Sequence, residues 1–414
     1  RWWTGCSSPF GLRPMNVVLL LCSNNATLPI HSSVRRVGAA GKVPVMTDEL
    51  LLGFCRLKEY WQHAGEIVSS RAAESLLGGG AAAVSETAAR QAVRRRFAEF
   101  GGCSERDAWL FPTGMAAIAC IWRAIRRLEP QRPTVQFGFP YVDTLKIQQR
   151  FRPQAWRFLP RGDATDLQQL AQLLQREPIS ALFCETPTNP LLTMPDLAEL
   201  RRLADAYGFL LIVDDTLAAV INDNPLPWAD AVATSLTKYF SGQGDVLAGG
   251  LRLNMQRPAA VRLQQAVAEE FEELLCDADV EVLERNSRDV RERVQVINAN
   301  AAELAVRLSQ HAAVQQVYYP PALTSGAGRG GLMSIVLKSP ARTTAGVFDR
   351  LRVCKGPNLG TSFTLCCPYT ILAHYTELDE VEAVGVSRWL LRISVGTEPL
   401  EDLWERFAEA LGGV

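Results

Sequence analysis

The sequence predicts an α/β protein whose large domain has a mainly parallel sheet and is followed by a smaller α+β C-terminal domain. In the middle of the chain, "ISALFCET", "FLLIVDDT" and "AVATSL" are apolar runs typical of strands, and the amphipathic "MPDLAELRRLADAYG" separates the first two. Such uniformly apolar strands indicate a parallel sheet buried on both faces. Nearer the C-terminus, "GGLMSIVLK", "AGVFDRLRVC" and "LLRISVGTEP" alternate strand and helix patterns, which is typical of an α+β domain.

The length of 414 residues allows two domains with sizeable cores. We expect a mainly helical N-terminal segment at 1–87 that contacts a neighbouring subunit, the large domain at 88–255, and linker helices with the C-terminal domain at 256–414. Apolar residues recur at helical spacing from Ala40 to about Glu99, with a break at "LLGGGAAAV" that we interpret as a flexible loop.

The composition argues against several classes of partner. The chain has 43 basic and 44 acidic residues, so no nucleic-acid partner is implied, and the basic run Arg94 to Arg96 fits the solvated face of a helix. The apolar stretch from Met15 is too short for a signal peptide or membrane span. Ten cysteines lack metal-ligand spacing, so we expect no metal, reduced thiols and a cytoplasmic location.

Two segments of the first half of the large domain carry candidate binding residues. In "PTGMAAIACIWRAIRRL", Thr113 and Gly114 open an apolar helix, whose unpaired first amides stabilise an anion. A plain N-cap by Thr113 would look the same. In "TVQFGFPYVDTLKIQQRF", a strand, a turn and a helix follow one another, and Tyr141 lies at the turn, where an aromatic is usually part of a core.

Three further polar residues follow or interrupt apolar strands. Asn189 lies in "ETPTNP", where it could donate an amide or simply belong to a Pro-bounded turn. Asp214 follows four apolar residues, and a carboxylate there is costly unless paired. Arg392, in "LLRISVGTE", has a planar fork suited to a carboxylate, either of a ligand or of an internal Asp or Glu.

The segment "ATSLTKYFSGQGDVLAGGL" contains the candidate for covalent chemistry. If the strand "AVATSL" ends near Thr237, Lys238 emerges at the carboxyl end of the sheet, where α/β proteins place their ligands. Desolvation there favours the neutral amine that a Schiff base requires. Taken alone, the lysine is better explained as a surface lysine before a turn, because "TK" by itself is a very weak motif.

These motifs together resemble the Cys/Met-metabolism family of pyridoxal-phosphate enzymes, which belongs to the aminotransferase-like fold type I. The resemblance spans about Ala88 to the C-terminus: "SLTKYFSGQGDVLAG", "TGM", "ETPTNP", "VDDT" and "RISVGTE" match the family's motifs in order. The segments "FGFPYVDTLK" and "NLGTSFTLCCPYTILAHY" are closest to the fungal-type cystathionine γ-synthases of the family.

The resemblance implies a role for each candidate. The catalytic set would be Lys238, which carries the cofactor, Tyr141, which stacks on its ring, and Asp214, which keeps its ring nitrogen protonated. Asn189 would face the ring hydroxyl, and Arg392 and Thr364 would bind the substrate. The cofactor phosphate would be held by Thr113, Gly114, Met115, Ser235 and Thr237.

Two departures from the family pattern bear on this reading. Asp215 replaces the usual asparagine of "VDNT", and would either add negative charge near the site or face away. The tyrosine and arginine that most members lend to the neighbouring subunit's phosphate site are missing from "LLGGGAAAV", and Arg71 is a weak substitute.

The resemblance implies a pyridoxal-phosphate-dependent transferase that catalyses a γ-replacement. The reaction would join an O-acylhomoserine to L-cysteine, giving cystathionine, in trans-sulfuration and methionine biosynthesis. O-acylhomoserine sulfhydrylase and methionine or cystathionine γ-lyase activities are alternatives, because these reactions share their early steps. A non-catalytic scaffold is the alternative of another class. The implied partners are small amino-acid substrates and further copies of the chain, in a homodimer or homotetramer.

Overall fold

The computed structural model describes residues 57, 59–219, 221–321 and 328–413. All the described residues belong to one compact unit, residues 49–414. The apolar stretch from Met15 and the first part of the predicted helical region, from Ala40, lie outside the described residues.

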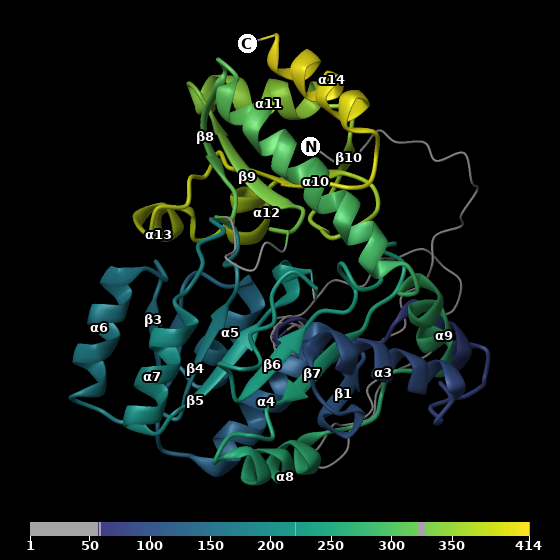
Figure 1. Cartoon of the computed structure of the whole chain (residues 1–414), viewed down its shortest axis with the longest axis vertical. Helices are drawn as coiled ribbons and strands as arrows, with labels where there is room; N and C mark the ends of the chain where they lie inside the picture. The colour runs from purple at the N-terminus through teal and green to yellow at the C-terminus, as the bar shows by residue number, and fades with distance from the viewer. Residues whose placement is uncertain (1–56, 58, 220, 322–327, 414) are drawn as a thin grey trace, which may run out of the picture. The chain divides into compact units, whose positions relative to one another are not determined.

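A seven-stranded sheet forms the centre of the large domain (Figure 1). Its order is β1-β7-β6-β5-β4-β2-β3. The five strands from β6 to β3 are parallel, and β7 pairs antiparallel with β6 and β1. The strands are β1 (Ala108–Phe111), β2 (Thr134–Phe137), β3 (Trp156–Leu159), β4 (Ala181–Glu185), β5 (Leu210–Asp214), β6 (Ala231–Thr234) and β7 (Gly249–Leu253). The prediction of a mainly parallel sheet is confirmed.

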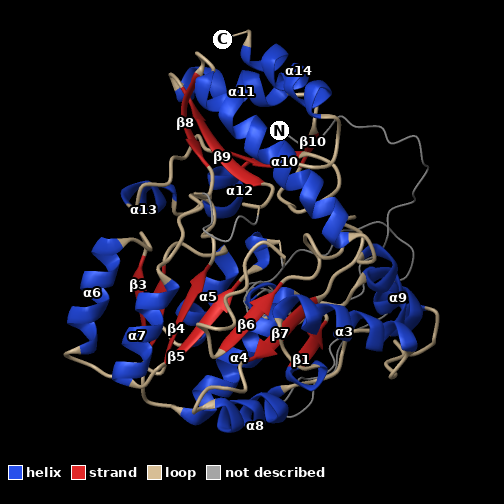
Figure 2. Cartoon of the chain, viewed as in Figure 1, coloured by secondary structure: helices blue, strands red, loops and turns tan. Residues whose placement is uncertain are grey.

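Helices cover both faces of this sheet, which explains why its strands are apolar throughout (Figure 2). Phe183 and Ile212 contribute to a core with α4 and α8, whereas their neighbours Leu182 and Leu211 contribute to a second core with α6 and α7. The helices of this part are α3 (Ala88–Gly101), α4 (Gly114–Leu128), α5 (Val142–Phe151), α6 (Ala164–Leu174), α7 (Leu197–Tyr207), α8 (Ala260–Glu270) and α9 (Asp277–Asn286), with short turns η2 (Glu105–Asp107) and η3 (Thr216–Ala218).

The segment before α3 is only partly helical among its described residues. It contains η1 (Glu59–His63) and α2 (Ser70–Leu77), after which the chain runs without regular structure to the N-cap Thr87. The glycine-rich stretch is therefore a loop, as predicted. The hydroxyl of Ser69 caps α2 by accepting a hydrogen bond from the amide of Ala72 at 3.1 Å.

A second sheet of five strands follows, in the order β10-β11-β12-β9-β8. It is antiparallel except for the pair β10 and β11. Its strands are β8 (Val314–Tyr318), β9 (Leu332–Leu337), β10 (Cys354–Lys355), β11 (Leu365–Pro368) and β12 (Leu391–Ser394). Its helices are α10 (Val290–Gln310), α11 (Pro340–Arg350), α12 (Tyr369–His374), α13 (Leu378–Ala383) and α14 (Leu400–Leu411). Apolar residues of α10, α11 and α14 form one core with β9 and β12, which confirms the predicted α+β part.

Helix α3 begins at Ala88, next to the predicted boundary, but α8 packs on α4 of the large domain although it lies beyond residue 255. Among the described helices, none combines the length and apolar character needed to cross a membrane. The seven cysteines in the described ranges are free thiols.

Candidate active site

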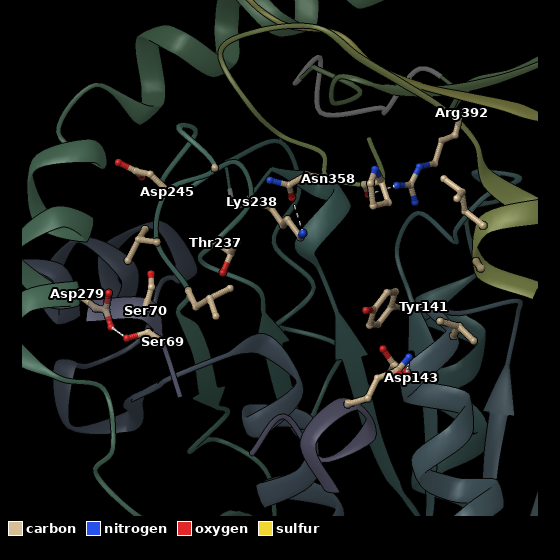
Figure 3. Close-up of a pocket in the computed structure, with 18 of the residues that line it drawn as sticks. Ser69, Ser70, Tyr141, Asp143, Thr237, Lys238, Asp245, Asp279, Asn358 and Arg392 are labelled. Atoms are coloured by element: carbon tan, nitrogen blue, oxygen red, sulfur yellow. Dashed lines mark hydrogen bonds between the residues drawn. The ribbon is translucent and has the colours of Figure 1, made fainter. Parts of the chain in front are cut away.

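A cavity of about 740 Å³ collects polar side chains from segments far apart in the sequence (Figure 3). The segment before α2, the start of α5, the turn after β6, the segment before β11 and strand β12 all contribute to its wall. Four of the predicted site residues line it: Tyr141, Thr237, Lys238 and Arg392.

Lys238 is half-buried and reaches this cavity from a turn rather than from the end of a strand. Strand β6 ends at Thr234, three residues earlier than predicted, because the amide of Ser235 donates to the hydroxyl of Thr216 at 2.8 Å and leaves the ladder. The Lys238 ammonium donates to Oδ1 of Asn358 at 2.6 Å. Burial, and then the nearby Arg392, lower the pKa of Lys238 to about 8, so far more of its amine is neutral near physiological pH than in an ordinary lysine, although the protonated form still predominates.

Arg392 is 5% exposed and is held by neutral partners. Its Nη1 donates to Oδ1 of Asn189 at 3.2 Å, its Nη2 donates to the carbonyl of Pro357, and its guanidinium lies 4.5 Å from the ring centre of Tyr369. Among the described residues, no Asp or Glu forms an ion pair with Arg392. A buried cation without a charged partner is costly, so this arrangement favours a ligand carboxylate over an internal one.

Asn189 links the two sheets. Its Nδ2 donates to the hydroxyl of Tyr369 at 3.1 Å while its Oδ1 accepts from Arg392, and the asparagine itself is 3% exposed. Asn189 belongs to the loop after β4, whereas Arg392 lies on β12 of the second sheet and Tyr369 begins α12 directly after β11. The structure thus assigns this asparagine a contact with the arginine fork, and its predicted contact with the cofactor ring stays a prediction.

Tyr141 is the N-cap residue of α5, is 43% exposed and lines the cavity. Its amide donates to Oε1 of Glu185, the last residue of β4, which fixes the turn. Asp143, two residues on, also lines the cavity and accepts hydrogen bonds from Gln62 and His63 of η1 at 3.1 and 2.7 Å. The position of Tyr141 suits an aromatic that covers a planar ligand.

Asp214 ends β5 beside Glu185 of β4, with which it is in register. Its Oδ1 accepts from the amide of Thr216 at 2.9 Å, and burial raises its pKa to about 6. Burial also raises the pKa of Glu185 well above its usual value, helped by Asp214. Asp215 faces away from this edge: it is fully buried and paired with Arg252, which resolves the alternative left open by the sequence.

The predicted phosphate residues meet where α4 begins. Thr113 is the N-cap, and its hydroxyl accepts from the amide of Ala116 at 2.9 Å and donates to the carbonyl of Gly65 at 3.2 Å. A Cβ on Gly114 would lie 2.8 Å from the Cβ of Ser235, so glycine is needed for this approach. The amides of Gly114 and of the next residue lie in the first turn, where a helix offers donors without intrahelical partners.

Two predicted hydroxyls are engaged elsewhere. Thr237 lines the cavity, but its Oγ1 donates to the carbonyl of Ala248 at 3.2 Å and accepts from the amide of the same residue at 3.0 Å. Thr364 is 1% exposed and does not line the cavity. Its Oγ1 donates to Oε2 of Glu398 at 2.8 Å and accepts from the amide of Gly396 at 3.0 Å, which leaves its substrate-binding role without geometric support.

The sequence reasoning missed several cavity residues. Asn358 and Tyr369 had no local signal of function, because they reach Lys238 and Arg392 only through the docking of the second sheet. Arg71 was only a weak candidate, yet it lines the cavity. Its Nη1 donates to Oδ1 of the buried Asp279 at 3.0 Å and to the carbonyl of Asp245 at 2.8 Å.

The donor set fits the expected cofactor, pyridoxal phosphate. This molecule carries an aldehyde, a pyridine nitrogen and a phosphate, which require an amine, an acid and an anion site respectively. The neutral-prone amine of Lys238, the carboxylate of Asp214 and the close approach of Gly114 and Ser235 at a helix N-terminus supply all three. The residues at this edge of the large sheet therefore fit the cofactor, with Lys238 in the cavity lining and Asp214, Gly114 and Ser235 outside it.

Comparison with known proteins agrees with this fit. A family model described as Cys/Met metabolism PLP-dependent enzyme matches residues 84–412. The cystathionine gamma-synthase of Neurospora crassa is 44% identical over 323 residues, which cover 74% of this chain and 52% of that protein. The cystathionine gamma-synthase of Saccharomyces cerevisiae is 40% identical over 343 residues, covering 74% of this chain and 53% of that protein.

A solved structure supports the fold directly. The crystal structure of cystathionine gamma synthase from Xanthomonas oryzae pv. oryzae in complex with cystathionine superposes with a TM-score of 0.70 at 26% identity. The match covers 79% of this chain and 86% of that one. The predicted fold class is thereby confirmed, while the chain spans about half the length of the curated relatives it matches.

Proposed function

Because this chain belongs to the Cys/Met-metabolism family of pyridoxal-phosphate-dependent enzymes, we propose that it is a transferase that joins an O-acylhomoserine to L-cysteine, giving cystathionine. The names of the Neurospora and Saccharomyces relatives support this γ-replacement over other reactions of the family. The resulting place in metabolism would be trans-sulfuration on the route to methionine.

The observation that carries the proposal is the shared cavity of Lys238 and Arg392. One residue supplies a nucleophilic amine and the other a buried guanidinium without an acidic partner among the described residues. An α-amino acid presents an amine-bearing carbon and a carboxylate, so it can engage both at once. A cavity lacking either group would bind a cofactor or a carboxylate, but not hold an amino acid over a reactive centre.

The residues of the chain divide the work between binding and proton transfer. Bound pyridoxal phosphate supplies an electron sink that stabilises negative charge on the substrate's α-carbon. Arg392 grips the α-carboxylate through its two terminal nitrogens, and Nζ of Lys238 takes and returns protons at the substrate's α and β carbons. Asn358 accepts a hydrogen bond from this amine and so holds it inside the cavity.

Asp214 and Tyr141 prepare the cavity for the cofactor. The Asp214 carboxylate would hold a proton on the ring nitrogen, and the ring of Tyr141 would cover one face of the cofactor ring. The first turn of α4, with Ser235 against Gly114, would hold the phosphate. A homodimer or homotetramer in the cytoplasm completes the proposal, supported by the family resemblance and by the free thiols of the described cysteines.

The test is to purify the protein with pyridoxal phosphate, reduce it with borohydride and map the adduct by peptide mass. We expect the adduct on Lys238, loss of the adduct and of turnover in Lys238→Ala, and both retained in Lys338→Ala, an exposed-lysine control. Cystathionine should form from cysteine and an O-acylhomoserine. Product formed only with sulfide, or without any thiol, would identify a sulfhydrylase or a lyase, and an unloaded protein without products would indicate the scaffold alternative.

A further inference from the structure

We propose that the buried pair Asp215–Arg252 is a positioning device for Asp214: the pair holds the neighbouring carboxylate in place, and Arg252 offsets the charge of Asp215 so that Asp214 stays ionised. The inference rests on the proposed function, because it assigns Asp214 to the cofactor's ring nitrogen. It adds two residues that do not touch the cavity themselves.

The two consecutive aspartates lie in opposite environments. Asp214 is in register with Glu185, whose carboxylate accepts the amide of the cavity residue Tyr141. Asp215 is 0% exposed and bonds to Arg252 of β7, which is also 0% exposed. The side chains therefore diverge, with Asp214 at the cofactor edge and Asp215 inside the protein.

Hydrogen bonds connect these two aspartates in a closed ring. Oδ1 of Asp215 accepts from the hydroxyl of Thr234 at 2.5 Å, and Thr234 directly precedes Ser235. The amide of Ser235 donates to the hydroxyl of Thr216 at 2.8 Å, and the amide of Thr216 donates to Oδ1 of Asp214 at 2.9 Å. Anchoring Asp215 therefore fixes the backbone on which both Asp214 and the predicted phosphate ligand Ser235 stand.

Arg252 has few alternatives to this partner. Its guanidinium lies 4.8 Å from the ring centre of Phe97, and a Cβ on Gly101 would lie 2.2 Å from its Nη1. Nε and Nη1 have no hydrogen-bond partner among the described residues. A cation enclosed in this way depends on Asp215, and Asp215 depends on it, since either alone would be an uncompensated buried charge.

The pair also controls the charge near Asp214. The titratable groups influenced by the charges of Asp214 and Asp215 are Glu185 and Cys184 from β4 and Asp223 after η3, whereas Cys103 is influenced by Arg252. Burial is the main reason why the pKa of Asp214 is raised, and the negative charge of Asp215 raises it further. Arg252 offsets that charge, so its removal should protonate Asp214 at higher pH, whereas removal of Asp215 should do the opposite.

The experiment compares the binding of two ligands by the apoprotein. Pyridoxal phosphate and 1-deazapyridoxal phosphate differ only in the ring nitrogen, so the ratio of their dissociation constants reports the contact with Asp214. We would measure this ratio from pH 5 to pH 8.5 in the wild type, Arg252→Met, Asp215→Asn and the double variant. In the wild type, the preference for pyridoxal phosphate should be lost as the pH is lowered through about 6, because Asp214 becomes protonated there.

We expect the midpoint to rise by about one pH unit in Arg252→Met and to fall in Asp215→Asn. Between the midpoints of the wild type and Arg252→Met, the ratio of the dissociation constants should then differ by about tenfold between the two proteins. The double variant, which removes both charges, should return to within about twofold of the wild type. Arg252→Lys keeps the charge and should keep the midpoint.

A matched control is the buried pair Arg201–Asp230, whose Nη1 and Oδ2 are 2.8 Å apart. Asp230 directly precedes β6, so this pair lies at the opposite edge of the sheet. Arg201→Met and Asp230→Asn should lower the unfolding temperature without moving the midpoint.

Unchanged midpoints in both Arg252→Met and Asp215→Asn, or equal shifts in the Arg201→Met control, would overturn the inference. If Arg252→Met does not fold, a downward shift in Asp215→Asn relative to the double variant supports the inference, and no difference refutes it. A wild type that fails to bind pyridoxal phosphate would instead refute the proposed function.

Discussion

Replacing Arg392 by methionine should remove recognition of the substrate carboxylate while leaving the cofactor bound. A guanidinium has five N–H donors. Two donors are used in the hydrogen bonds to Asn189 and Pro357, and each terminal nitrogen keeps a second hydrogen for a carboxylate oxygen. Hydrogen bonds to charged groups are worth about 1.5–3 kcal/mol each, so losing two costs about 3–6 kcal/mol. This corresponds to a decrease of roughly 10²- to 10⁴-fold in kcat/KM.

The assay measures kcat/KM for an O-acylhomoserine and for an analogue in which hydrogen replaces the α-carboxylate. Arg392→Met should slow the true substrate by the factor above and change the analogue by less than about threefold, because the analogue never engaged the arginine. Arg392→Lys keeps the charge but loses the fork, so it should fall between the two. The absorbance of the bound cofactor should be the same in all three proteins.

Two results would refute this reasoning. A fall of less than tenfold for the true substrate, with the cofactor bound, would mean that the carboxylate is held elsewhere. An equal fall for substrate and analogue would mean that the substitution disturbs the cavity in general, through the lost contacts with Asn189 and Tyr369.

The remaining predictions concern the lysine, the helix start and one buried hydroxyl. Acylation of Lys238 in the apoprotein, followed by peptide mass against pH, should have its midpoint near pH 8, because only the neutral amine reacts and burial lowers its pKa; a midpoint above pH 10 would contradict this. Gly114→Ala should weaken pyridoxal phosphate binding by about tenfold or more, since its Cβ would lie 2.8 Å from that of Ser235, and unchanged affinity by fluorescence titration would argue against the phosphate site there. Thr364→Val should destabilise the fold by about 1–3 kcal/mol in denaturant unfolding, because Glu398 loses a donor, and leave KM unchanged; a raised KM with normal stability would restore its predicted substrate role.

The sequence predicted the parts of the fold whose signal is local. The strands around Phe183 and Ile212 are apolar on both faces because helices cover both faces, and this pattern is visible in the residues alone. The end of β6 was misplaced, because the hydrogen bond from Ser235 to Thr216 that ends it joins segments 19 residues apart. Apolar content continues through Leu236, which belongs to a different core.

The site shows the same division between local and distant information. Lys238, Tyr141 and Arg392 were found from motifs, and the structure brings all three to one cavity. Asn358 was missed because its partner lies 120 residues away. The fate of Asp215 could not be chosen from the sequence either, since its partner Arg252 is identified only by the pairing of β7 with β6.

Residues of both sheets and their loops line the cavity. The attachment of the cofactor depends mainly on the first sheet, and the recognition of the substrate carboxylate depends mainly on the second. Lys238 lies in the turn after β6 of the first sheet, whereas Arg392 lies on β12 of the second sheet and Asn358 in the loop between β10 and β11. Changes along β12 can therefore alter how a ligand carboxylate is held without rebuilding the turn that bears Lys238, whereas a change at Asn358 would affect Lys238 directly. New substrate preferences should arise first in the second sheet, and exchange of that half between relatives should transfer them.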